Sequence, residues 1–178
     1  AAFGIYLPKY NGSIFELMSA PISAYEIVIG YAGAAASKSI LISILILLTS
    51  TIFVDFYIKH PLLMVLLLVI TSITFSLFGF IIGIWATNFE KLQLIPLIII
   101  TPLVFLGGSF YSISMLPELW QLVTKFNPIF YIINGFRWSF FGTSDIDLFT
   151  SLSLIIVFLF ICLAIIGLIF KTGYRIKG

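Results

Sequence analysis

The sequence predicts an all-α, polytopic transmembrane helical bundle, and three observations lead to this fold class. Of the 178 residues, 61% are hydrophobic and only 9% are charged, whereas soluble domains carry about 25% charged residues. The mean hydropathy of +1.22 points the same way. Four nearly uncharged runs are long enough to cross roughly 30 Å of hydrocarbon as helices. Lipid must therefore cover most of the outside.

The four runs fall within one transmembrane domain, 1–178. We expect its spans at 26–54, 62–88, 92–108 and 148–170. The strands of a membrane barrel are shorter and alternate in hydropathy, which these runs do not. Four helices place both ends of the chain on one side of the membrane. The positive-inside rule assigns that side to the cytoplasm, because the tail holds Lys171, Arg175 and Lys177.

The third span is unusual because Pro96 and Pro102 lie within it and Gly107-Gly108 interrupt it. A helix from Leu92 to Leu106 would extend only about 22 Å, which is less than the hydrocarbon core. The following run, 109–142, is too apolar for an ordinary loop. We expect it to form a re-entrant or extracellular helical hairpin in the outer leaflet. The alternative is an aromatic belt that lies flat on the membrane.

A second distinctive segment, 11–21, precedes the first span on the expected cytoplasmic side. Ser13 and Glu16 have the spacing of a capping box, and Pro21 ends the predicted helix. Four apolar side chains would be displayed there: Ile14, Phe15, Leu17 and Met18. Exposed apolar side chains require a protein partner or the lipid interface, so this helix is a candidate docking element.

Several classes of function find no support in the sequence. The net charge of +2 is too small to indicate a nucleic-acid partner. Cys162 is the single cysteine and His60 the single histidine, so neither a disulfide nor a metal site is expected. There is no phosphate-binding loop and no hydrolase motif. No carboxylate lies in the middle of a span, where an ion-driven carrier usually has one. We therefore expect no catalytic residue, no metal and no cofactor bound by this chain.

The chain opens Ala-Ala-Phe-Gly, without methionine and without a signal-peptide pattern. We expect that earlier spans precede Ala1 in a longer protein.

Several short motifs stand out in the second half of the chain. They are Gln93-Leu94-Ile95-Pro96, Thr101-Pro102-Leu103, Leu106-Gly107-Gly108-Ser109-Phe110-Tyr111, Leu116-Pro117, Trp120, Asn127-Pro128 and Asn134-Gly135-Phe136-Arg137. Together they resemble the signature of the ABC-2 type transporter permease family. The segment Phe15 to Pro21, with the later Gly30-Tyr31, is similar to the second cytoplasmic loop of the same family. The resemblance covers nearly the whole chain. It is strongest to small bacterial permeases that pair with a separately encoded ATPase.

The resemblance implies six transmembrane helices, of which this chain would hold the end of the second and the third to the sixth. It implies a coupling helix that is seated in the ATPase subunit, formed by Ser13, Ile14, Phe15, Glu16, Leu17, Met18 and Pro21. It also implies a gate in the re-entrant region, formed by Leu106, Gly107, Gly108, Phe110, Tyr111, Trp120, Asn127, Pro128 and Arg137.

The function implied by the resemblance is that of a non-enzymatic permease subunit of an ABC exporter in the bacterial inner membrane. Two permease copies, forming a homodimer in membrane lipid, would work with two ATP-binding subunits that hold ATP and Mg²⁺. The cargo would be amphipathic, lipid-linked or drug-like. One alternative is an ion-coupled secondary transporter, which a steep pH or sodium dependence would reveal. Another is a membrane-embedded enzyme or a non-transporting assembly subunit.

Overall fold

The computed structural model describes residues 1–55 and 57–173, without the side chain of Met18, and these residues are mainly helical. The expected tail residues Arg175 and Lys177 lie outside the described part. In chain order the helices are α1 (Ala2–Tyr10), α2 (Ile14–Ser19), α3 (Ala24–Phe53), α4 (Pro61–Trp85), α5 (Phe89–Ile95), the π-helix η1 (Pro96–Ile100), α6 (Thr101–Leu106), the 3₁₀-helix η2 (Ile113–Met115), α7 (Glu118–Lys125), α8 (Pro128–Phe141) and α9 (Leu148–Thr172).

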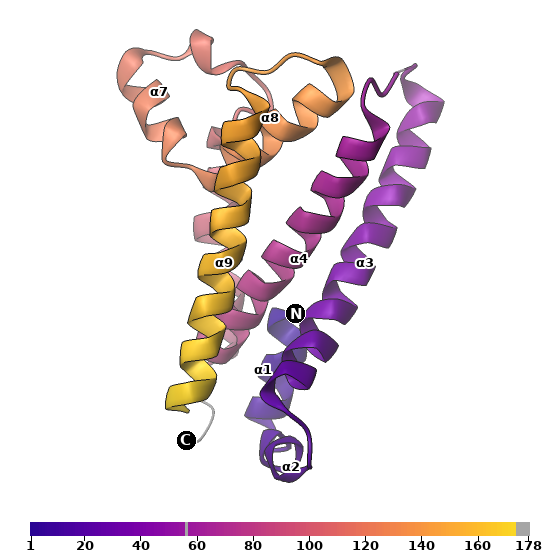
Figure 1. Ribbon diagram of the computed structural model, residues 1–178. Helices are drawn as coiled ribbons and strands as arrows, with labels where there is room; N and C mark the ends of the chain where they lie inside the picture. Colours follow the sequence, from indigo (N-terminus) through magenta and orange to yellow (C-terminus); the bar gives the residue numbers. More distant parts are fainter. Residues whose placement is uncertain (56, 174–178) are drawn as a thin grey trace.

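The long helices form a bundle with two distinct ends (Figure 1). α1, α2 and the last turns of α9 lie at the lower end of the view, called the α2 end below. α7 and α8 lie at the opposite end, called the α8 end, where α9 diverges from α3 and α4. α4 runs between the two ends and packs against α1, α3, α8 and α9.

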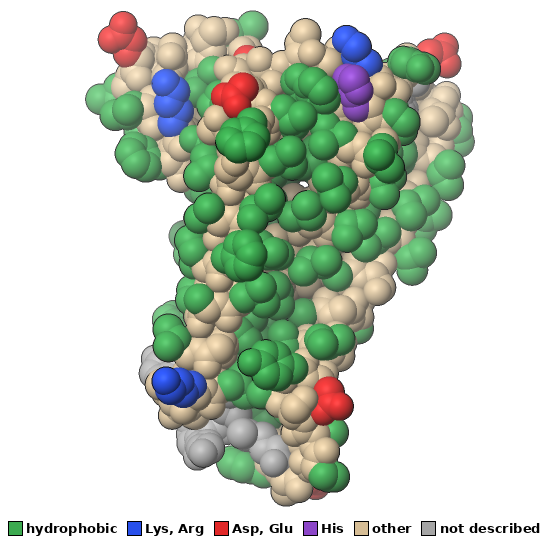
Figure 2. Space-filling model, viewed as in Figure 1, with side chains coloured by type: hydrophobic (Ala, Val, Ile, Leu, Met, Phe, Trp, Pro, Cys, Tyr) green, Lys and Arg blue, Asp and Glu red, His purple; other side chains and the backbone are tan. Residues whose placement is uncertain are grey.

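The predicted fold class is confirmed. Within the described ranges, four helices are long and apolar enough to cross a membrane: Ala24–Phe53, Pro61–Trp85, Phe89–Leu106 and Leu148–Thr172. Figure 2 shows apolar side chains over the middle of the molecule, with the coloured charged side chains near its two ends. This distribution suits a hydrocarbon layer with water on both sides. The chain is a multi-pass membrane protein.

The third span begins at Phe89 rather than at the expected 92, and Pro96 and Pro102 lie within continuous helix. α5 continues through η1 into α6 as one helical segment. At η1 the amide of Thr101 donates to the Pro96 carbonyl, five residues back, which widens one turn. The wider turn accommodates proline rings that would clash with the carbonyl four residues earlier in a regular α-helix. The span ends at Leu106, two residues before the expected limit, and covers about 27 Å at about 1.5 Å per residue.

The main apolar core lies toward the α2 end. It joins buried side chains from α1, α2, α3, α4 and α9, namely Ile5, Ile14, Val28, Ala32, Leu77, Phe80, Ile84, Cys162, Ile166 and Ile169. A smaller cluster of Leu67, Ile132 and Ile155 joins α4, α8 and α9 near the other end. These two clusters determine where α2 and α8 sit relative to the spans.

Candidate functional site

α8 is the element of the predicted gate that packs most extensively into the bundle, against α9, α4 and α6. Local signals define its limits. The Asn127 side chain accepts a hydrogen bond from the Ile129 amide, and Pro128 occupies the first turn, where no amide partner is needed. Gly142 ends the helix at a φ of 74°, the left-handed conformation that glycine adopts without cost. α8 is therefore a well-delimited helix set among three others.

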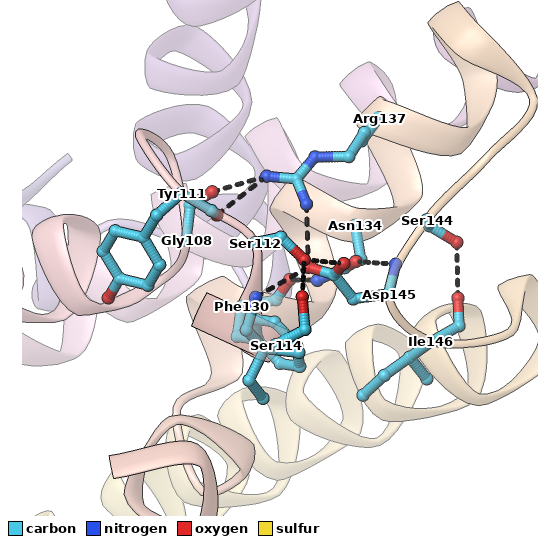
Figure 3. Close-up of polar contacts among 11 residues, drawn as sticks. Gly108, Tyr111, Ser112, Ser114, Phe130, Asn134, Arg137, Ser144, Asp145 and Ile146 are labelled. Atoms are coloured by element: carbon cyan, nitrogen blue, oxygen red, sulfur yellow. Dashed lines mark hydrogen bonds and ion pairs between the residues drawn. The ribbon is translucent and has the colours of Figure 1, made fainter. Parts of the chain in front are cut away.

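Arg137 on α8 connects three separate segments of the chain (Figure 3). Its Nη1 lies 2.8 Å from Asp145 Oδ2 in the α8–α9 loop. Its Nη2 donates to the carbonyls of Gly108, at 2.6 Å, and Tyr111, at 3.3 Å. A guanidinium group has donors arranged in a fixed planar fork, so one side chain can hold a carboxylate and two carbonyls together.

Asp145 forms the other half of this arrangement. It accepts hydrogen bonds from the Ser112 hydroxyl and from the Ile113 amide at 3.1 Å, while its own amide donates to Asn134 Oδ1 at 2.9 Å. Partial burial of Asp145 works to raise its pKa. The hydrogen bonds from Ser112 and Ile113 and the charge of Arg137 outweigh the burial and hold the pKa below its ordinary value. The carboxylate is therefore ionised at neutral pH.

We call this network the α8 clamp; it comprises Gly108, Tyr111, Ser112, Ile113, Asn134, Arg137 and Asp145. The loop that follows α6 is thereby fastened to two elements: α8, through Arg137, and the α8–α9 loop, through Asp145. Gly108 takes part through a backbone turn with a φ of 82°. A side chain at this position would be strained whatever space surrounds it.

A second tie joins α6 directly to α8. The Gly107 amide donates to the Val104 carbonyl, three residues back. The Leu103 carbonyl instead accepts from Asn127 Nδ2 at 2.6 Å. The buried Asn127 side chain thus caps α8 with its oxygen and satisfies the end of α6 with its nitrogen.

The structure separates the predicted gate residues into two groups. Gly108, Tyr111 and Arg137 belong to the α8 clamp, and Leu106, Gly107, Asn127 and Pro128 surround the α6–α8 tie. Phe110 and Trp120 do not enter these networks: Phe110 is exposed and stacks on Phe105, and Trp120 is exposed on α7. The sequence reasoning missed Ser112 and Asp145 as site residues, and named Asn134 only within a motif.

α7 has an apolar face turned away from the bundle. Leu119, Leu122, Val123 and Phe126 recur at helical spacing and are all exposed, whereas Thr124 on another side is buried. An amphipathic helix of this kind suits a membrane interface.

At the α2 end, the predicted capping box at Ser13 and Glu16 is wrong. Ser13 has helical backbone angles and makes no capping hydrogen bond with its side chain. Gly12, with a φ of 78°, leads the chain from α1 almost directly into α2, so Ser13 lacks the extended conformation that an N-cap needs. The capping box forms instead between Ser23 and Glu26, at the start of α3. α2 ends at Ser19, because Ala20 is extended ahead of Pro21.

The expected display of apolar residues on α2 also needs a correction. Ile14 is only 5% exposed and belongs to the main core, and Leu17 is half-buried beside it. Phe15 is 57% exposed and Glu16 is also exposed. The side chain of Met18 lies outside the described part. α2 therefore presents Phe15 and Glu16 outward, while Ile14 anchors it to the spans.

Comparison with known proteins places this helical pattern in a family. The sequence profile of the family described as "ABC-2 type transporter" matches residues 1–141. Over 151 residues the chain is 38% identical to proteins named "Inner membrane transport permease YadH" from Escherichia coli strain K12, Escherichia coli O157:H7 and Shigella flexneri. The matched region is 85% of this chain and 59% of each relative, so the chain spans less than two thirds of their length. No solved structure gives a significant match.

The family match covers α1 through α8, including most of the α8 clamp and, at the α2 end, α1 and α2 but not α9. It confirms the resemblance that the motifs around Gly107-Gly108 and Asn134 to Arg137 carried. The chain belongs to the ABC-2 type transporter family.

Proposed function

We propose that the chain belongs to the permease subunit of an ATP-driven exporter in a bacterial inner membrane. Two permease copies would enclose the path, and two ATP-binding subunits would supply ATP and Mg²⁺. Family membership and the name of the relatives support the permease class. The cargo would be an amphipathic, lipid-linked or drug-like molecule, because apolar side chains dominate the walls of the bundle.

The observation that carries the proposal is that the two ends of one bundle have different features: a helix with outward-facing side chains at one end and the α8 clamp at the other. α2 is anchored through Ile14 and presents Phe15 and Glu16 outward, which suits docking into another subunit. At the opposite end, the α8 clamp ties the residues after α6 to α8 and to the α8–α9 loop, which suits a gate. Lys9 in α1 and Lys171 in the last turn of α9 lie at the α2 end, and Lys91 lies in α5, whose Leu92 is buried with Tyr6 of α1. The positive-inside rule assigns this end to the cytoplasm. ATP-driven movement would enter at α2 and open the α6–α8 region to the outside.

The docking role can be tested by photo-crosslinking in the full-length permease with the ATPase encoded beside it. A benzophenone maleimide would be attached to Phe15→Cys in a Cys162→Ala background. Tyr57→Cys, at an 84% exposed position near the α8 end, is the matched control for labelling. We expect a crosslink to the ATPase from position 15 and none from position 57. Absence of the crosslink at position 15 in a complex that hydrolyses ATP would reject the docking role.

A secondary transporter is the competing class. It would move cargo without the ATPase and would follow a proton or sodium gradient. Vesicles that contain the full-length permease alone separate the two classes, because the proposal requires that these vesicles remain inactive under either gradient.

A further inference from the structure

α4 is attached to the helices at both ends of the molecule. Near its last turn it packs against α1, and near its first turn it packs against α8. It also contacts α3 and α9. At both ends, close backbone contacts and hydrogen bonds hold α4 against its neighbours and oppose sliding of one helix along the other.

At the α2 end, the backbone of α1 lies directly on Gly83 of α4. A Cβ atom added at Gly83 would overlap the Ala2 carbonyl oxygen and lie 2.5 Å from Ile5 Cγ2. Lys9 Nζ donates to the Ile84 carbonyl and, at 3.1 Å, to the Ala86 carbonyl. These carbonyls belong to the end of α4, where the helix has no internal donors for them and where a positive charge is favourable.

α2 is part of the same attachment. Ile14 of α2 and Ile5 of α1 are buried together with Phe80 and Ile84 of α4. The space left among these side chains is about 10 Å³, room for one water at most. Such close packing transmits displacement rather than absorbing it. A push on α2 therefore acts on α4.

At the α8 end, α4 and the residues before it are attached to α8. The amides of Lys59 and His60 donate to the carbonyls of Phe140 and Ser139, at 3.1 and 2.9 Å. The ring of His60 stacks on Trp138 with centroids 4.3 Å apart. Near the middle of α8, a Cβ added at Gly135 would lie 3.2 Å from Leu67 Cδ2 of α4.

We propose that α4 is the strut that carries movement from α2 to α8, and that Gly83 is the position where α1 is seated on it. This inference rests on the proposed function and specifies its route. α3 follows α2 directly in the chain and is the alternative route. Within the described residues, α3 packs mainly on α4 and has no comparably extensive contact with α8. α4 contacts both ends and is the more direct route.

The first test locks α1 to α4. Cβ atoms at Ala2 and Gly79 would lie 4.0 Å apart, within the range for a disulfide. Ala2→Cys with Gly79→Cys would be introduced into the full-length permease with Cys162→Ala and combined with the ATPase. ATP-dependent hydrogen exchange of residues 128–141 is the readout. If α1 and α4 move as one body, oxidation leaves this response unchanged within about twofold. A loss of about tenfold that reductant reverses would show that the helices must slide, and would overturn the inference.

The second test compares two glycines one turn apart on α4. Gly83→Ala forces α1 away, whereas a Cβ at Gly79 meets its nearest atom at an ordinary 3.5 Å. Gly83→Ala should keep the Phe15 crosslink and ATP hydrolysis but reduce the response of α8 about tenfold, and Gly79→Ala should not reduce it. An undiminished response in Gly83→Ala would also overturn the inference. If Gly83→Ala fails to fold, the disulfide experiment alone tests the inference. A wild-type complex without the Phe15 crosslink would reject the proposed function instead.

Discussion

Arg137 Nη1 lies 2.8 Å from Asp145 Oδ2, so that α8 and the loop leading into α9 are joined by an ion pair. The same guanidinium holds the Gly108 carbonyl, 29 residues earlier, at 2.6 Å. The exit from the third span is therefore fixed to the last two helices by one side chain. Breaking the pair should release this end of the molecule and leave the α2 end intact.

Asp145→Asn should destabilise the α8 clamp by about 1 to 3 kcal/mol, because it leaves the guanidinium of Arg137 partly buried without its carboxylate. The measurement is thermal unfolding of the full-length protein in detergent. The matched control is Asp147→Asn, an exposed position where asparagine still caps α9. Equal losses in both variants would contradict the role of Asp145.

The ion pair should not act as a pH sensor near neutrality. Asp145 has a pKa below its ordinary 3.8 in the folded protein, so its contribution to stability is present above that value and lost as the pH falls through the folded pKa. The difference in unfolding temperature between wild type and Asp145→Asn should be constant between about pH 5 and 8 and should shrink only below about pH 4. A difference that disappears between pH 5 and 7 would contradict this assignment.

Asn127 has two separable tasks. Asn127→Asp keeps the oxygen that caps α8 but loses the donor to the Leu103 carbonyl, whereas Asn127→Ala loses both. We expect the alanine variant to lower the free energy of unfolding by about 2 kcal/mol, with part of this loss in the aspartate variant. Hydrogen exchange should place the effect of Asn127→Asp at the end of α6. If hydrogen exchange at the end of α6 is unchanged in this variant, the hydrogen bond to Leu103 does not contribute to stability.

The start of α3 offers a paired test of the two capping-box sequences. Ser23→Ala removes an observed cap and should lower the free energy of unfolding by about 1 kcal/mol. Ser13→Ala removes a hydroxyl that makes no capping bond and should be nearly neutral. Denaturant or thermal unfolding of the two variants side by side provides the comparison, and a reversed order would contradict the structure of the α2–α3 connection.

Ser13 and Ser23 also show which features of the structure can be predicted from the sequence and which cannot. Hydropathy is a local property, so the long apolar runs predicted the four long helical segments to within a few residues. Asn127-Pro128 is likewise a local signal for the start of a helix. Ser13 and Ser23 each precede a glutamate by three residues, and only the left-handed turn at Gly12 determines that the first cannot cap. No local pattern distinguishes them.

The remaining features depend on contacts between distant segments. The burial of Ile14 follows from packing against α4, which the apolar pattern of α2 alone does not reveal. Asp145 looked like an ordinary loop carboxylate, because its partners Ser112 and Ile113 lie more than thirty residues earlier. The π-helical turn at Pro96 allows the span to remain helical although it contains two prolines. The hydropathy of the segment does not indicate such a turn.

The most direct measurement is hydrogen exchange of residues 107–116 in the full-length permease, reconstituted with and without its ATPase. The proposed function predicts that this loop, which the α8 clamp holds, becomes less protected when ATP is added to the complex. The permease alone should not respond to ATP, to protons or to sodium. The same loss of protection in the permease alone, driven by an ion gradient, would contradict the view that energy enters through α2.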